Sequence, residues 1–210
     1  MEAILSVIRL EPRENAEYEL ALDDIAEETA RLRALAEGLL RLARCARPQP
    51  MDLVAGDASL LAEDVVEAMR PLAEAKGLDL ASRIEPGLTV LGDSDSVIRV
   101  MLNLLDNAIK FTESGGTVTV SAFSQGDGTF VEVADTGIGI PADRHTSVFE
   151  RFYRVDSSRS TPGAGLGLSL AQQMVHENGG ELSVASKEGS GSTFTVRFNG
   201  DRSFWPALVG

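Results

Sequence analysis

Apolar residues recur at three- and four-residue intervals through residues 97–109, and this spacing predicts an amphipathic helix. The apolar positions are Val97, Met101, Leu104, Leu105, Ala108 and Ile109. The polar positions of the same helix fall in one stripe, which contains Arg99, Asn103, Asp106, Asn107 and Lys110. Asp93 or Ser94 is the expected N-cap, and Gly115 and Gly116 close the segment.

A longer pattern occupies the first part of the chain. From Tyr18 to Ala43, apolar or small residues alternate in steps of four and three, as in a heptad seam. Together with the apolar stub AILSVIRL before it, this pattern predicts a helical hairpin over residues 1–48, ended by Pro48 and Pro50. We expect residues 14–46 to pair with a second copy. The alternative is a helix packed on its own domain.

The rest of the chain mixes helical and strand patterns. Helices are predicted over 52–75 and 168–178, and strands over 78–86, 89–91, 117–123, 129–135, 181–186 and 192–198. Residues 143–162 have weak periodicity, which is typical of a mobile lid or a binding loop. No pattern covers the final residues, so 201–210 are expected to be a tail, either disordered or foreign to the natural chain.

The polar stripe offers chemistry. Asparagine is a poor helix former, so two of them inside a helix carry a cost that some function should offset. Amides one turn apart with a lysine beyond them can hold hydrated Mg²⁺ and the phosphates that it carries. The plainer interpretation of the stripe is a solvated helix face.

Two glycine-containing segments also suggest ligand contact. Asp135 ends a predicted strand and precedes Gly137 and Gly139, an arrangement in which a carboxylate can accept an adenine amine while the glycines leave room for the ring. The ordinary alternative is a turn in which Asp135 caps the backbone. The run 163–167, GAGLG, opens a helix, and N–H groups at a helix N-terminus attract anions.

Composition excludes several classes of function. The 210 residues have a net charge of −13, which argues against nucleic-acid binding. No apolar run approaches a membrane span and no secretory signal is apparent, so we expect a soluble, cytoplasmic fragment whose full-length parent is possibly membrane-attached. The single Cys45 excludes an internal disulfide, and with His145 and His176 it makes no zinc site.

Four motifs in a fixed order connect these observations. NLLDNAIKFT, DTGIGI, FERFYR and GAGLGL resemble the asparagine box, first glycine box, phenylalanine box and second glycine box of sensor histidine kinases. The resemblance implies an α+β fold of the GHKL or Bergerat type, a two-layer sandwich in which helices cover one face of a mixed sheet. It also implies an ATP-binding domain over 49–200, after a partial dimerisation hairpin over 1–48.

The resemblance carries roles residue by residue. It implies that Asn107 coordinates Mg²⁺, that Asn103 and Lys110 contact or position the phosphates of ATP, and that Asp135 binds the adenine amine beside Gly137 and Gly139. The lid would use Gly163, Gly165, Leu166 and Gly167 as hinge and phosphate-facing loop, Phe149 and Phe152 as anchors, and Arg151 and Arg154 near the γ-phosphate. Asn103 stands where related ATPases place a glutamate that activates water, so the resemblance implies transfer rather than fast hydrolysis.

One family feature is missing from the sequence. The phosphorylated histidine of the family lies in an H-E-L-R-T-P-L motif, and this chain begins where that motif would end. His145 and His176 do not replace it. We therefore expect a kinase core, truncated or split, that phosphorylates a histidine on another chain for a response regulator. The alternative is a non-catalytic, nucleotide-binding regulator that acts through the hairpin.

Overall fold

The computed structural model describes residues 54–153 and 165–199. The chain divides into two compact units, residues 1–48 with 156–166 and residues 49–155 with 167–210. All helices and strands described below belong to the second unit. The expected hairpin over 1–48, its pairing surface over 14–46 and the tail over 201–210 lie outside the described residues, so these three expectations and the boundary between the domains stay predictions.

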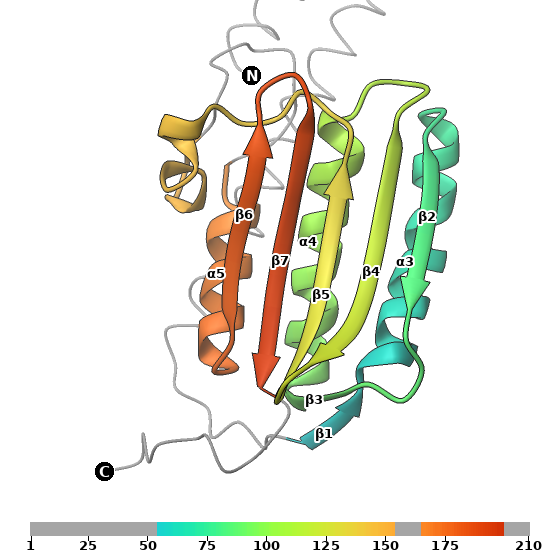
Figure 1. The fold of residues 1–210 in the computed structure, drawn as a ribbon, viewed down its shortest axis with the longest axis vertical. Helices are drawn as coiled ribbons and strands as arrows, with labels where there is room; N and C mark the ends of the chain where they lie inside the picture. Colours follow the sequence, from blue (N-terminus) through green and yellow to red (C-terminus); the bar gives the residue numbers. More distant parts are fainter. Residues whose placement is uncertain (1–53, 154–164, 200–210) are drawn as a thin grey trace, which may run out of the picture. The chain divides into compact units, whose positions relative to one another are not determined.

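A five-stranded mixed sheet forms one layer of the second unit, with the strand order β2-β4-β5-β7-β6 (Figure 1). Its strands are β2 (Asp79–Ile84), β4 (Thr117–Gln125), β5 (Gly128–Asp135), β6 (Glu181–Lys187) and β7 (Gly191–Asn199). Strand β2 runs parallel to β4, and the other neighbours are antiparallel. The mixed sheet expected from the sequence is confirmed.

Three helices form the other layer and cover one face of this sheet (Figure 1). They are α3 (Ala58–Ala75), α4 (Ser94–Phe111) and α5 (Gly167–Glu177). Every second residue of the central strands is buried beneath them, as Val118, Val120 and Ala122 show in β4. The predicted two-layer α+β fold is therefore confirmed, with its core between the helices and one side of the sheet.

Helix α4 packs between α3 and α5 and supplies much of the core. Its predicted apolar positions, from Val97 to Ile109, are all at most 3% exposed. Asp93 is the N-cap, because its carboxylate accepts hydrogen bonds from the Ser96 backbone N–H at 3.0 Å and the Ser96 hydroxyl at 2.6 Å. The burial of one face leaves the polar stripe of α4 at the boundary with solvent.

The helix expected over 52–75 begins later than predicted. Val54–Asp57 form strand β1, which pairs antiparallel with β3 (Thr89–Gly92), and α3 starts only at Ala58. Asp57 caps α3 by accepting the Leu60 N–H at 3.0 Å. Four residues carry too little periodicity to mark a strand locally, so its pairing with a distant segment decided the structure.

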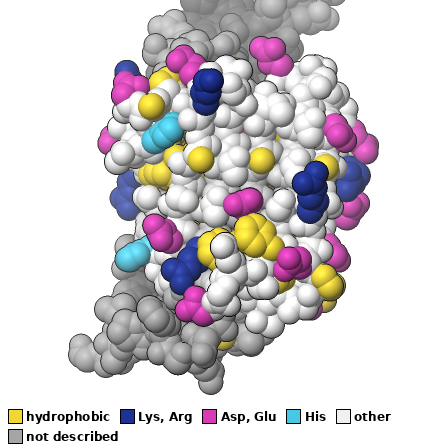
Figure 2. Space-filling model, viewed as in Figure 1, with side chains coloured by type: hydrophobic (Ala, Val, Ile, Leu, Met, Phe, Trp, Pro, Cys, Tyr) yellow, Lys and Arg dark blue, Asp and Glu magenta, His cyan; other side chains and the backbone are white. Residues whose placement is uncertain are grey.

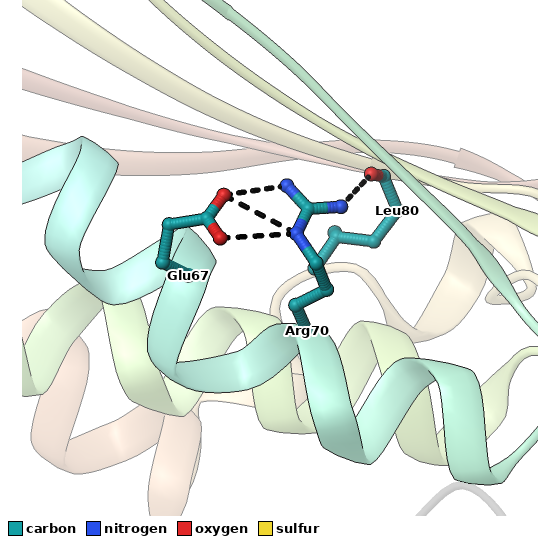
Figure 3. A network of polar contacts seen from close by, with 3 residues as sticks. All are labelled: Glu67, Arg70 and Leu80. Atoms are coloured by element: carbon teal, nitrogen blue, oxygen red, sulfur yellow. Dashed lines mark hydrogen bonds and ion pairs between the residues drawn. The ribbon is translucent and has the colours of Figure 1, made fainter.

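Arg70 ties α3 to β2, which is an edge strand (Figure 3). Its guanidinium contacts the Glu67 carboxylate at 2.7 Å and donates to the Leu80 carbonyl oxygen at 3.0 Å. An edge strand has backbone groups that no neighbouring strand satisfies, and Arg70 occupies one of them. Within the described ranges, no helix combines the length and the apolar character that a membrane crossing requires.

Candidate functional site

The two asparagines of α4 lie half-exposed on its polar side. The Asn103 amide nitrogen donates to the Arg99 carbonyl oxygen at 2.8 Å, so this side chain is held against its own helix. The Asn107 side chain forms no hydrogen bond with any described residue. Since a partly shielded amide normally has a partner, Asn107 is suited to bind a ligand that the chain itself does not provide.

Gly167, the first residue of α5, faces both asparagines. A Cβ atom at this position would lie 3.3 Å from Asn103 Oδ1 and 3.7 Å from Asn107 Nδ2. The structure thus brings the last glycine of the GAGLG run next to the asparagine box. The N-terminus of α5 presents unsatisfied N–H groups and the positive end of the helix dipole beside these amides, a combination that favours an anion.

Asp135 ends β5 with its carboxylate partly buried. Its Oδ1 atom accepts the Gly137 N–H at 2.8 Å and the Ser192 N–H at 3.3 Å, whereas Oδ2 has no hydrogen-bond partner among the described residues. Burial raises the pKa of Asp135, and the two N–H donors partly oppose that rise. One carboxylate oxygen therefore remains available for an external donor such as an amine.

The loop after Asp135 is held against the end of α4. The Ile138 N–H donates to the Phe111 carbonyl oxygen at 3.2 Å, and a Cβ atom at Gly137 would collide with the same carbonyl. Gly139 has a φ of +67°, and a Cβ atom there would collide with the Lys187 carbonyl oxygen. Because Phe111 lies one helical turn after Asn107, the Asp135 loop and the asparagines converge along one helix.

Three residues that support this arrangement were missed by the sequence reasoning. Ser192 donates its N–H to Asp135, and Gly191 packs so closely on the Asp135 carbonyl that a Cβ atom would collide with it. Lys76 donates from Nζ to the Ile109 and Lys110 carbonyl oxygens, at 2.8 and 2.7 Å, at the C-terminus of α4. Only the pairing of β5 with β7 and the packing of α3 on α4 bring these residues there.

The predicted lid anchors differ from one another. Phe149 packs edge-on against Phe194, with ring centroids 6.4 Å apart, and joins the core. Phe152 is 57% exposed and has a φ of +66°, so it does not pack as Phe149 does. The short 3-10 helices η1 (Ala142–Arg144) and η2 (Ser147–Phe149) form the described part of the segment expected to be irregular.

The arginines and the remaining glycines are placed less completely. Arg151 donates to the Gln173 side-chain oxygen at 3.3 Å, and both residues line a hollow of about 590 Å³ over α5 together with His176. Arg151 therefore does not lie with the asparagines in this structure. Arg154 and Gly163 fall outside the described residues. Gly165 and Leu166 belong to the first unit, so their place in the site stays a prediction.

Both histidines have plain structural surroundings. His145 Nε2 lies 3.2 Å from the Ile140 carbonyl oxygen, and His176 is exposed on α5. The described residues contain no group of three or more His, Cys, Asp or Glu side chains that could hold a metal ion. A metal at this site would therefore depend on amide oxygen and on the oxygens of its own ligand.

Comparison with known proteins places residues 92–202 in a family of histidine kinase-, DNA gyrase B- and HSP90-like ATPases. The sensor histidine kinase RppB of Synechocystis is 35% identical over 205 residues, which cover 94% of this chain and 44% of RppB. The mycobacterial sensor histidine kinase MprB has a solved structure that is 30% identical, with a TM-score of 0.62; the match covers 70% of this chain and 97% of that one.

A third match is full-length ShkA, solved in complex with AMPPNP. It is 30% identical with a TM-score of 0.72, and the match covers 93% of this chain and 40% of ShkA. The chain spans less than half of the length of the curated relatives that head the comparison.

Proposed function

Since the chain belongs to the histidine kinase-, DNA gyrase B- and HSP90-like ATPase family, as a histidine kinase catalytic core, we propose that it binds Mg-ATP and donates the γ-phosphate to a histidine outside its 210 residues. The observation that carries this proposal is the convergence on α4: Gly167 faces Asn103 and Asn107, and the Asp135 loop is bonded to Phe111 one turn further on. An elongated ligand with a phosphate end and an amine end fits this line of groups.

The phosphate end would lie over Asn103, Asn107, Lys110 and Gly167. Mg²⁺ prefers oxygen ligands and keeps several waters, so one amide oxygen together with phosphate oxygens is a suitable donor set. The Asn107 amide, which has no partner among the described residues, would supply that oxygen. The match to ShkA bound to AMPPNP supports a nucleotide at this site.

The adenine end would lie at Asp135. The exocyclic amine is a donor, and the Oδ2 atom of Asp135 is an acceptor without a described partner. The loop from Gly137 to Gly139 carries no Cβ at the two positions where the backbone packs most closely, which keeps this edge of the site narrow. This arrangement favours a base with an amino group at its outer edge.

The site has amides where a hydrolase needs a base. Asn103 lies one turn before Asn107, and an amide cannot take a proton from water. Phosphoryl transfer depends chiefly on positioning and on neutralising charge, which Mg²⁺ and Lys110 would provide. Transfer to a protein acceptor therefore suits these residues better than rapid hydrolysis.

The acceptor and the later partners are further parts of the proposal. A histidine of another segment or chain would take the phosphate, a response regulator would receive it, and residues 14–46 would join two copies. Arg151 and Arg154 would approach the γ-phosphate only after the lid segment rearranges, because Arg151 contacts Gln173 here.

The test is to mix the full chain with γ-labelled Mg-ATP and a separate fragment that carries an H-box histidine. We expect label on the fragment, and no label when the fragment histidine is replaced by alanine. Nucleotide binding without transfer would support the regulator alternative instead. A chain that fails to bind Mg-ATP would overturn both.

A further inference from the structure

The face of the sheet that the helices leave open is lined mainly by small polar residues. Thr119 and Ser121 of β4 and Thr193 and Thr195 of β7 are partly exposed, while their strand neighbours are buried on the helix side. Two aromatic residues interrupt this surface, Phe123 on β4 and Phe130 on β5. Figure 2 shows hydrophobic atoms gathered in the lower half of this face, among acidic and basic side chains.

Phe123 and Phe130 form one aromatic pair. They are direct cross-strand partners, and their rings stack with centroids 5.5 Å apart and planes 6° from parallel. Beside them lies a hollow of about 460 Å³, whose lining includes Phe123, Arg83, Glu85 and Glu132. An apolar patch next to a hollow on an otherwise polar surface is typical of a docking surface.

The segment that follows β7 starts close to this patch. Phe130 pairs with Arg197, so the aromatic pair lies beside β7, two residues before it ends at Asn199. With strands about 4.8 Å apart and a rise of about 3.3 Å per residue, Phe123 lies roughly 12 Å from Asn199. Six residues separate Asn199 from Trp205, enough for an extended reach of about 20 Å.

The chemistry of that segment matches the patch. Residues 204–209 read FWPALV and carry no charge. An indole ring packs well on aromatic faces, and its N–H needs an acceptor when it is shielded from water. Two carboxylates line the hollow: Glu85 uses one oxygen to accept the Ser124 N–H, and Glu132 uses one to accept the Thr195 hydroxyl. Each has a second oxygen that can accept the indole N–H.

We propose that residues 200–210 of this chain fold back over the open sheet face, with Trp205 against the Phe123–Phe130 pair and its N–H directed to Glu85 or Glu132. The tail would then be an intramolecular cover that shields the patch from association with other molecules. This proposal does not depend on the nucleotide site, which involves α4, α5 and the end of β5.

Trp205 is the single tryptophan of the chain, so its fluorescence reports the position of the tail directly. In the native full chain we expect emission at shorter wavelength, and acrylamide quenching several-fold weaker, than in the urea-unfolded chain. Phe123→Thr should shift both values toward those of the unfolded chain, because threonine preserves the strand but removes the ring. Thr119→Ala, on the same strand and face, is the matched control and should leave both values unchanged.

Circular dichroism melting shows whether each variant remains folded, and Phe130→Thr provides a second test if Phe123→Thr unfolds the chain. Native emission equal to that of the unfolded chain would overturn the proposal. So would emission that neither phenylalanine substitution changes. Emission that depends on protein concentration would assign the docked tail to a second copy and reject the intramolecular cover.

Discussion

At the residue scale, the Asn107 amide is the group whose surroundings leave most to a ligand. It is half-exposed, has no described hydrogen-bond partner and faces Gly167. Asn107→Asp should preserve the fold but place a negative charge where phosphates would bind. We expect affinity for Mg-ATP to fall about 100-fold, or roughly 2.7 kcal/mol, by isothermal titration calorimetry.

Asp106→Asn is the matched control for this change, because it alters a neighbouring, exposed residue by the same two groups in the opposite direction. Its affinity for Mg-ATP should stay close to that of the unaltered chain. Normal binding of Mg-ATP by Asn107→Asp would contradict the role assigned to Asn107.

Asp135 has a pH dependence whose sign follows from its burial. Burial raises the pKa of the folded-state carboxyl above its unfolded value, so its contribution to stability is present at low pH and is lost as pH rises through the folded-state pKa. Asp135→Asn keeps an oxygen for the Gly137 and Ser192 N–H groups and removes the charge. The variant should be as stable as the unaltered chain, or more so, at neutral pH in urea unfolding.

The same variant should bind Mg-ATP at least tenfold more weakly, because a hydrogen bond to a charged acceptor contributes about 1.5–3 kcal/mol. Stability and affinity would thus change in different directions. A parallel loss of both near neutral pH would show that Asp135 acts as a structural cap, which was the alternative open from the sequence.

At the scale of the element, α4 depends on charges at both ends. Asp93 caps its N-terminus, and Lys76 of the α3 C-cap donates to the Ile109 and Lys110 carbonyl oxygens. A cation at a helix C-terminus is favourable, because it offsets the negative end of the dipole. Since α4 also holds the Asp135 loop through Phe111, Lys76 stabilises the part of the helix on which the candidate site depends.

Lys76→Met should therefore lower the free energy of unfolding by about 1–2 kcal/mol, as measured by urea denaturation. Lys76→Arg is the control, because it retains the charge and the donors, and it should recover most of the loss. Equal destabilisation by both substitutions would indicate that packing of the alkyl chain, and not charge at the helix end, is responsible.

A second buried amide connects helices in the same way. Asn178, at 2% exposure, accepts the Asp93 N–H at 2.9 Å and donates to the Met174 carbonyl oxygen at 2.7 Å. It joins the end of α5 to the start of α4. The two helices that carry the asparagines and Gly167 are therefore held together by a polar contact at the end opposite the Asp135 loop.

At the scale of the whole molecule, assembly is the remaining prediction. If the heptad seam over residues 14–46 pairs, light scattering should show a dimer, and Leu32→Glu should convert it to a monomer by placing a charge in the seam. Arg33→Glu changes the charge next to the seam and should leave the dimer intact. A monomer in the unaltered chain would contradict pairing through this segment.

Local pattern predicted the elements of the second unit well, because periodicity records which face of each element is buried. The apolar positions of α4 are buried as expected, and β4 and β5 alternate as expected. The order of the four motifs likewise predicted the family and the two-layer fold. These properties depend on residues close together in the chain.

Contacts between distant segments were decided by the tertiary structure. The Asp135–Ser192 and Lys76–Ile109 contacts, and the pairing of β1 with β3, join residues whose local patterns carry no sign of each other. Arg151 and Phe152 show the same limit, since their motif predicted a shared role while packing directs Arg151 to Gln173 and leaves Phe152 exposed. Sequence determined which groups the chain possesses and on which faces they lie; packing of the helices and pairing of the strands determined which of them meet.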